Sequence, residues 1–413
     1  MQETLFSYRN GGILTFSNSL AFLLAENGLE LDADYHDYEA DFCSIILGEE
    51  RASKHTKVKG GKVRMHRNVN VAVADDLTIR EESKNRHPKW GNYREYHDWL
   101  LGVLRTIADN ATDGARRRQY GMISTISRGY DATASSVMAY EVGCREALTM
   151  AQLEDDNGSE IARLLGYISI HEVDKNAYKK NTKLLEAEIA GSGEVSGMLE
   201  AYEQLCAGKL VFMGDRGDSL WERLHDNVND HLDFSSGNGF AQASLTPVEY
   251  TSRINAIVVR VPLIGGDSWS ELARLSSSEE MKPWSVREKY DRPLARRMVE
   301  EKGIDRTAFG QEKKGGGVSF HYNTLRSMKA KMSGESYQSL TDFKRHLKRN
   351  RWKALGNEVR FYASEYDVYV NYVLSRIGIK KRIKRKHQTY RSSPLGNLMI
   401  LWGVHEMKKR YTQ

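Results

Sequence analysis

Two short segments combine glycine with acidic side chains in a way that suits phosphate chemistry. They are "SRGYDATAS", which contains Ser127, Gly129 and Asp131, and "GDRGDSLW", which contains Asp215 and Asp218. A glycine-containing turn that opens a helix presents backbone N–H groups and the positive end of the helix dipole to an anion. One aspartate from each turn could then share a Mg²⁺ ion that bridges phosphate oxygens.

Each segment taken alone also fits a purely structural role. The first could be a tight strand-to-helix connection in which Asp131 favours the helix N-terminus, and the second a surface loop with an Asx-turn. Finding both directly after predicted strands favours the phosphate interpretation, because ligands of parallel sheets bind beyond the carboxyl ends of the strands.

Alternating strands and helices position these turns. The apolar runs "YGMISTI", "EALTM" and "KLVFMG" predict buried strands. Between them, "ATASSVMAYEVG", "NGSEIARLLGY" and a stretch around residues 193–207 predict helices. Strands that alternate with helices predict an α/β fold with a doubly wound parallel sheet.

The flanking regions differ in pattern. Residues 1–92 alternate polar and apolar positions between Gly and Asn turns, which predicts antiparallel strands, with a hairpin at "KVKGGKVRMH". A helix with Tyr96, Leu100, Leu101 and Leu104 on one face begins the region 93–325. From about residue 270 the pattern is mostly helical, and "LGNLMILWGVHEM" near the end predicts core packing. We therefore expect three parts: 1–92, 93–325, and a basic helical region, 326–413.

The composition bounds the class of protein. A chain of 413 residues with 40% hydrophobic residues is long enough for two or more folded domains, and a net charge of +6 indicates a mildly basic surface. The three cysteines are far apart, which argues against a disulfide framework or a thiolate zinc site and favours a reducing compartment. No signal-like or membrane-spanning run is present, so we expect a cytoplasmic protein without membrane contact.

The two acidic turns resemble signatures of the asparagine synthase branch of the N-type ATP pyrophosphatases. "SRGYDATAS" is similar to the pyrophosphate loop, usually Ser-Gly-Gly-x-Asp-Ser, and "VFMGDRGDSLW" to the second signature, Gly-(Glu/Asp)-Gly-x-Asp-(Glu/Ser)-(Leu/Val)-(Phe/Trp). "VPLIGGDSWSELARL" stands where the branch has a Pro-Phe-Leu-Asp segment, and "FGQEKKGGG" where a lysine-bearing loop closes over ATP. The N-terminal region is similar to the tail of a glutaminase domain. This resemblance implies an adenine nucleotide alpha hydrolase-like fold.

The resemblance also implies an ATP- and Mg²⁺-dependent ligase that adenylates a carboxylate, releases pyrophosphate, and lets ammonia or an amine attack the acyl-adenylate. Asp131 and Asp218 would hold the metal, and Asp215 would assist proton removal from the attacking amine. Lys313 or Lys314 would neutralise charge on the phosphates. The implied ATP- and pyrophosphate-binding residues are Ser127, Arg128, Gly129, Asp131, Thr133, Gly214 and Gly217.

The chain departs from the family pattern at several positions. Arg128 replaces the first loop glycine, and its guanidinium could reach a phosphate or point to solvent; Ala132 replaces the serine after the aspartate. Members that hydrolyse glutamine need an N-terminal cysteine, whereas here position 2 is Gln2 and the first cysteine is Cys43. We therefore expect free ammonia, ammonia from a separate glutaminase partner, or an amine-bearing substrate.

Basic segments near the C-terminus leave other partners open. "FKRHLKRNRWK" and "RIGIKKRIKRKHQTYR", with Trp352 and Tyr390, could contact an anionic substrate or nucleic acid, or could be solvated faces. One alternative function is adenylation coupled to sulfur transfer or base modification, for which Cys144 and Cys206 are the plausible thiols. The other is non-catalytic binding of nucleic acid or a partner through a degenerate nucleotide loop.

Two further groups favour structural roles. Asp291 and Arg292 are expected to form a structural ion pair, although arginines in this segment could bind a substrate carboxylate. His225 and His231 are six residues apart, which puts them off a common helical face and argues against zinc.

Overall fold

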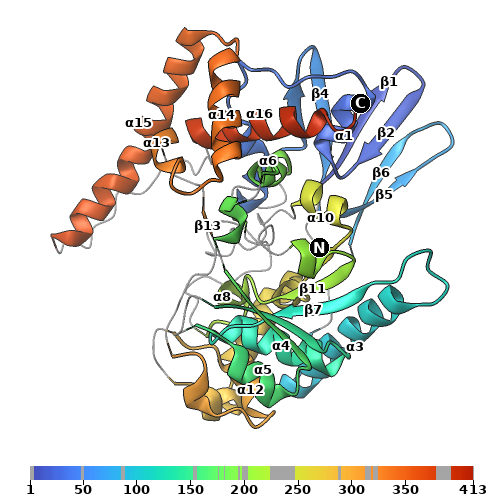
Figure 1. Ribbon diagram of the computed structural model, residues 1–413, viewed down its shortest axis with the longest axis vertical. Coiled ribbons are helices and arrows are strands. Elements are labelled where there is room, and N and C mark those ends of the chain that lie inside the picture. The colour runs from blue at the N-terminus through green and yellow to red at the C-terminus, as the bar shows by residue number, and fades with distance from the viewer. Residues whose placement is uncertain are drawn as a thin grey trace.

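The computed structural model describes most of the chain between residues 4 and 412. The described ranges are 4–47, 51–84, 89–151, 156–174, 176–180, 182–193, 196–197, 203–223, 247–286, 290–311, 318–319, 324–377 and 392–412. In Figure 1 the N-terminal strands and the C-terminal helix α16 occupy one end of the molecule, and a parallel sheet with its helices occupies the other. Lys313, Lys314, Tyr390, His225 and His231 lie outside the described residues.

A five-stranded parallel sheet forms the centre of the second part. Its strands are β7 (Gly121–Thr125), β8 (Glu146–Met150), β9 (Ser169–Val173), β11 (Lys209–Met213) and β12 (Ile257–Arg260). They lie in the order β12-β11-β7-β8-β9, so the chain builds outward from β7 in one direction and then crosses to build outward in the other. This confirms an α/β fold with a parallel sheet, and the direction of winding reverses between β7 and β11. The sequence analysis did not identify β9 or β12.

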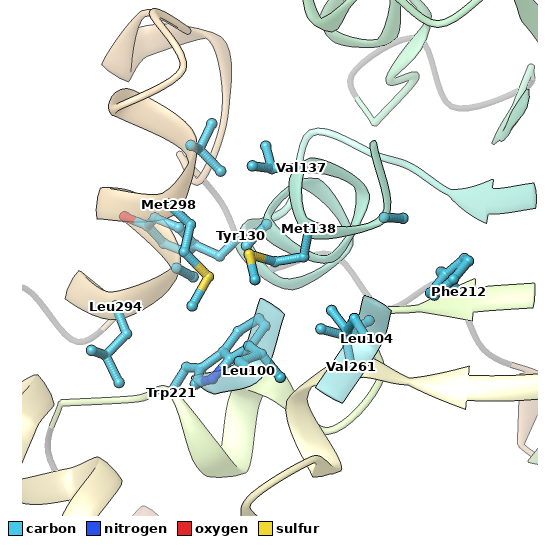
Figure 2. Packing of buried hydrophobic residues seen from close by; sticks show 14 of the residues in the cluster. Leu100, Leu104, Tyr130, Val137, Met138, Phe212, Trp221, Val261, Leu294 and Met298 are labelled. Carbon is cyan, nitrogen blue, oxygen red and sulfur yellow. The ribbon is translucent and has the colours of Figure 1, made fainter. Parts of the chain in front are cut away.

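Helices cover this sheet and bury a large aromatic core. The helices of this part are α3 (Tyr93–Thr112), α4 (Tyr130–Glu141), α5 (Ser159–Leu165), α6 (Leu185–Gly191), α7 (Glu203–Cys206), α8 (Gly217–Leu220), α10 (Val248–Ile254), α11 (Trp269–Ser276) and α12 (Pro293–Glu300). Figure 2 shows residues of α3, α4 and α12 meeting around Trp221, whose indole N–H donates to the Tyr96 hydroxyl at 2.8 Å. All four residues of the predicted apolar face of α3 are buried, as expected.

The predicted helix around residues 193–207 is wrong in part. Only α7 is helical there among the described residues, and Ser196–Gly197 forms strand β10, which pairs with β13 (Val318–Ser319). Because that partner lies more than a hundred positions away, local sequence carries no signal of it.

The N-terminal region contains an antiparallel sheet in the order β2-β1-β4-β3 and a separate two-stranded ribbon. The strands are β1 (Leu5–Asn10), β2 (Ile13–Ser17), β3 (His55–Val58) and β4 (Gly61–His66), with β5 (Val69–Val73) and β6 (Ile79–Ser83) in the ribbon. The predicted hairpin is confirmed, since Val58 pairs with Gly61 across the turn.

The sequence predicted only strands in this region, and that prediction is wrong in part. The region also contains the helices α1 (Leu20–Glu26) and α2 (Tyr38–Cys43). Ser19 caps α1 by accepting the Phe22 N–H, and the helix buries Leu20, Leu23 and Leu24. Their spacing is that of one helical face.

The C-terminal helices are α13 (Leu325–Met328), α14 (Gly334–His346), α15 (Arg351–Arg376) and α16 (Pro394–Lys408). Helix α16 is buried in a cluster that also includes residues of the N-terminal sheet and of α6, so the predicted core role of "LGNLMILWGVHEM" is confirmed. None of the described helices combines the length and apolar character needed to cross a lipid bilayer.

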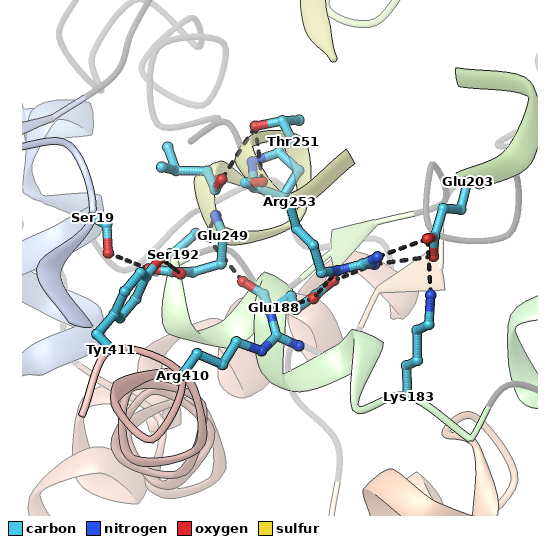
Figure 3. Close-up of polar contacts among 12 residues, drawn as sticks. Ser19, Lys183, Glu188, Ser192, Glu203, Glu249, Thr251, Arg253, Arg410 and Tyr411 are labelled. Atoms are coloured by element: carbon cyan, nitrogen blue, oxygen red, sulfur yellow. Dashed lines mark hydrogen bonds and ion pairs between the residues drawn. The ribbon is translucent and has the colours of Figure 1, made fainter. Parts of the chain in front are cut away.

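Buried carboxylates tie these parts together. Glu188 of α6 is fully buried and accepts from Arg253 of α10 and Arg410 beyond α16, each at 2.5 Å (Figure 3). Arg253 also contacts Glu203 at 2.7 Å, and Lys183 reaches the same carboxylate at 2.9 Å. The two cationic partners compensate the buried charge of Glu188. Loss of one partner would leave part of that charge uncompensated in the core and would destabilise the fold.

Helices α6 and α16 approach so closely that a glycine is required. A Cβ on Gly403 would collide with the backbone of Gly191 and sit 2.7 Å from the Ala187 carbonyl oxygen. We expect Gly403→Ala to lower the free energy of unfolding by about 1–3 kcal/mol. The matched control is Gly356→Ala in the interior of α15, where a Cβ meets nothing within 4 Å. That change should stabilise by roughly 0.5–1 kcal/mol through helix propensity. Urea unfolding measures both, and equal effects would contradict the proposed close packing.

The Glu203 ion pairs predict a defined acid dependence. Its hydrogen bond with Arg253 lowers the pKa of Glu203 from 4.5 to about 2. Because the pKa of Glu203 is lower in the folded state than in the unfolded state, the ion pairs stabilise the fold fully above pH 4.5. This stabilisation is lost as the pH falls towards 2. Glu203→Gln should therefore cost about 1–2 kcal/mol near pH 7, allowing for solvent screening, and less as the pH falls below 4.5. A difference between wild type and variant that grows on acidification would refute this.

Candidate functional site

The turns that follow β7 and β11 meet at the carboxyl edge of the parallel sheet. The two strands are hydrogen-bonded neighbours, with Phe212 opposite Ser124, so they end at nearly the same level. Asp131 lies in the first turn of α4, after β7, and Asp218 lies in α8, after β11. The two acidic segments identified in the sequence are therefore brought together where the winding of the sheet reverses.

Two glycines allow the turns to touch. A Cβ on Gly214 would collide with the backbone of Asp131 and Ala132, and a Cβ on Gly217 would collide with the Asp131 carboxylate. Any side chain at these positions would push the turns apart. The sequence analysis predicted that Gly214 and Gly217 bind the nucleotide. In the structure their lack of a side chain allows Asp131 to lie beside Asp218.

The Asp131 carboxylate has an unusual electrostatic environment. Burial raises its pKa to about 7, Arg292 opposes that rise, and the charge of Asp218 adds to it. One carboxylate oxygen pairs with the Arg292 guanidinium, while Oδ1 is buried with no hydrogen-bond partner among the described residues. The side chain keeps 18% of its surface exposed. A second cation beside these carboxylates would relieve the repulsion between them.

The loop before α4 is held by its own side chains. The Gly129 N–H donates to Ser127 Oγ at 3.0 Å, and the buried Thr133 hydroxyl lies 2.7 Å from the carbonyl oxygens of both Ser127 and Gly129. Thr133 is thus committed to shaping the loop. Because Gly129 is the N-cap and provides no side-chain acceptor, the first N–H groups of α4 have no partner from the cap or from within the helix. Such N–H groups at a helix N-terminus can donate hydrogen bonds to a bound anion.

Arg128 is partly buried and contacts the segment around Ala308. The proposed reach of its guanidinium to a phosphate stays a prediction. Its Nε donates to the Ala308 carbonyl at 3.2 Å, and its own carbonyl accepts the Gly310 N–H at 2.7 Å. Gly310 also packs on the Tyr130 ring too closely to carry a side chain. The segment that leads to Lys313 and Lys314 therefore starts against the loop, although the two lysines themselves lie outside the described residues.

Asp215 lies beside an arginine that the sequence analysis did not single out. Its Oδ2 accepts from Arg260 Nε at 2.7 Å, whereas Oδ1 is buried and has no hydrogen-bond partner in the described part of the chain. Arg260 ends β12, the edge strand missed from sequence, which explains why this pairing was not foreseen. The ion pair orients Asp215, and Oδ1 keeps a free lone pair to accept a proton.

The expected pair of Asp291 with Arg292 is wrong. Asp291 accepts from the Ser285 hydroxyl at 2.5 Å and pairs with Arg223 at 3.5 Å, while Arg292 turns to Asp131. Arg292 is only 2% exposed, lies 4.8 Å from the Tyr290 ring centroid, and has Nε and Nη2 without hydrogen-bond partners among the described residues. Asp291 precedes the N-cap Arg292 of α12, and the two side chains meet partners from different elements, so sequence proximity did not predict pairing.

The residues present suit a divalent cation shared by Asp131 and Asp218. Carboxylate oxygens are the ligands that Mg²⁺ prefers, and Asp131 Oδ1 lacks a hydrogen-bond donor among the described residues. The described residues contain no group of three or more His, Cys, Asp or Glu side chains able to hold a metal by themselves. A metal here would therefore need phosphate or water oxygens to complete its shell.

The three cysteines lie outside the two acidic turns. Cys43, Cys144 and Cys206 are all buried and unpaired with one another. Burial raises the pKa of Cys144 to about 12, which keeps it a thiol at neutral pH.

A cavity of about 1020 Å³ lies elsewhere, between the N-terminal region and the helices α14 and α16. Its lining includes charged side chains that already pair with each other, such as Lys59 with Glu30 and Lys409 with Glu406. None of its lining residues belongs to the turns after β7 and β11. We therefore place the candidate site at the sheet edge and not in this cavity.

The C-terminal basic region is described in part. Trp352, at the start of α15, is 82% exposed, and Lys344, Arg345 and His346 form the last turn of α14. Residues 378–391, which include most of the second basic segment, lie outside the described residues.

Comparison with known proteins adds no name to this site. No protein-family model and no curated protein matches the chain.

The contact between the two turns can be tested at Gly214. We expect Gly214→Ala to lower the free energy of unfolding by about 1–3 kcal/mol or more, because the new methyl group meets backbone atoms that cannot move aside easily. Gly114→Ala is the control, since its Cβ would meet only the end of the Gln119 side chain, at 3.7 Å. Thermal unfolding that responds equally to both changes would argue against the tight contact.

Proposed function

We propose that this protein is an ATP- and Mg²⁺-dependent ligase that adenylates a carboxylate and forms an amide with ammonia or an amine. One observation carries the proposal: Asp131 and Asp218 lie together at the reversal point of the parallel sheet, beside the uncapped N-terminus of α4. Nucleotide phosphates bind at this position in open α/β sheets. The adenine nucleotide alpha hydrolase-like assignment and the asparagine synthase-like resemblance belong to the same proposal.

The loop residues would hold the triphosphate. The first N–H groups of α4 and the Ser127 hydroxyl offer hydrogen bonds to the pyrophosphate. Arg292 Nη2, which has no hydrogen-bond partner among the described residues, adds a positive donor. A Mg²⁺ ion held by Asp131 and Asp218 would neutralise charge on the phosphate oxygens as pyrophosphate departs. Lys313 or Lys314 would add to this from the segment after Gly310.

Asp215 would act in the second half of the reaction. A carboxylate oxygen of the substrate attacks the α-phosphorus of ATP, and pyrophosphate leaves. The amine then attacks the acyl carbon, loses a proton to Asp215 Oδ1, and expels AMP. The Arg260 ion pair fixes the other oxygen of Asp215, so the free one has a defined direction.

The alternatives have weaker support. A sulfur-transfer route through Cys144 would need a thiolate, and burial disfavours one. Nucleic-acid binding through the basic C-terminal region alone does not explain why Asp131 and Asp218 lie together.

Separating the two half-reactions tests the proposal. With a panel of amino acids, peptides and sugar acids, the wild type should support carboxylate-dependent exchange of pyrophosphate into ATP, and should release AMP when ammonia or an amine is added. Asp131→Asn and Asp218→Asn should each lower exchange by about 100-fold or more, because the developing phosphate charge loses its metal. Asp215→Asn should keep exchange and slow amide formation by about 100-fold.

Asp76→Asn serves as the control, since this exposed aspartate lies in the turn between β5 and β6 and should change neither step. Unchanged exchange in Asp131→Asn and Asp218→Asn, with both variants folded, would overturn the proposal. Equal loss of both half-reactions in Asp215→Asn would remove only the role given to that residue.

A further inference from the structure

A second, separate pocket lies at the opposite edge of the parallel sheet. It has a volume of about 580 Å³ and is lined by Arg116, Arg117, Arg118, Tyr120 and Asn255. Tyr120 directly precedes β7, and Asn255 lies just before β12, so the pocket is at the amino ends of the strands. Five-residue strands span about 16 Å, which separates this pocket from the acidic turns at the carboxyl ends.

The pocket carries positive charge that nothing in the described chain neutralises. None of the three arginines forms an ion pair with a carboxylate among the described residues. Arg116 is instead held by neutral groups: its Nη1 donates to Asn110 Oδ1 at 2.5 Å, and its guanidinium lies 5.7 Å from the Tyr120 ring centroid. Arg117 and Arg118 are exposed beside it. Three adjacent cations that lack a carboxylate partner in the described part of the chain favour an anionic ligand.

The floor of the pocket offers an unused donor. The Tyr120 hydroxyl donates to Asn255 Oδ1 at 2.9 Å, which fixes the orientation of the amide. Asn255 Nδ2 is then buried with no hydrogen-bond partner among the described residues. The residue has a φ of 52°, a left-handed conformation that asparagine tolerates better than most side chains. An unsatisfied buried N–H group is costly unless a ligand accepts from it.

We propose that this pocket binds a phosphate group, with Asn255 Nδ2 and the guanidinium groups of Arg117 and Arg118 as donors. Arginine favours phosphate because its planar fork donates two parallel hydrogen bonds to a pair of oxygens. The phosphate could come from a small phosphorylated molecule or from a nucleic-acid backbone. The proposal is independent of the ligase activity, because no residue of this pocket lies in the turns that would bind ATP.

Two probes distinguish the sources of the phosphate: inorganic phosphate, followed by NMR of the arginine and asparagine side-chain N–H groups, and a fluorescent twelve-residue oligothymidylate, followed by anisotropy. Arg117→Ala/Arg118→Ala should weaken whichever probe binds by about tenfold or more. If the oligonucleotide binds, the slope of log affinity against log salt should fall by roughly 1.4, as expected for the loss of two contacts.

Asn255→Asp is the sharper variant. Its carboxylate can still accept from Tyr120 and tolerates the left-handed backbone, but it places an anion where the donor was, so binding should again fall about tenfold or more. Arg94→Ala/Arg105→Ala removes two exposed arginines from α3 outside the pocket and should leave binding within about twofold of wild type. The proposal is overturned if neither probe binds, or if the pocket variants bind as the α3 control does.

Discussion

The close approach of the turns after β7 and β11 is the constraint on which the candidate site depends. Any residue larger than glycine at positions 214 and 217 would collide with Asp131 or Ala132. The parallel register of β7 and β11 places the carboxyl ends of the two strands at the same level. The cost is electrostatic, because Asp131 is buried next to another carboxylate and its pKa rises to about 7. Arg292 offsets part of this cost. Such perturbed groups in a positioned pair are typical of functional sites.

Other buried carboxylates hold the parts of the molecule together. Glu39 of α2 accepts from the backbone and side chain of Ser393, the N-cap of α16, and Glu186 of α6 accepts in the same way from Ser333, the N-cap of α14. In both cases a carboxylate meets the positive end of a helix dipole. These contacts, with the Glu188 network, fix the C-terminal helices to segments far away in sequence. The framework that carries the parallel sheet thus includes all three parts of the chain.

Much of the architecture was predictable because it follows from local pattern. The strands β7, β8 and β11 are short apolar runs, the buried face of α3 has helical spacing, and the hairpin of β3 and β4 has its glycine turn. Strand β9 was missed because "SIHEV" is short and contains a histidine and a glutamate, and β12 was missed because "IVVR" is only four residues long. The helix α1 was hidden because seven residues give barely two turns of periodicity.

The sequence by itself determined where the two acidic turns lie, their order along the chain, and that each follows a strand. These features depend on residue types and on the spacing of apolar residues within one short segment. Only the tertiary structure decided which cations meet these carboxylates. Arg292 reaches Asp131 across 161 positions and Arg260 reaches Asp215 across 45, whereas the sequence neighbour Asp291 turns away to Arg223. The same holds for Asn255 and Tyr120, which meet across the start of the sheet. Pairings of this kind arise from the packing of whole elements, and a pattern read along one segment contains no information about the element that will pack against it.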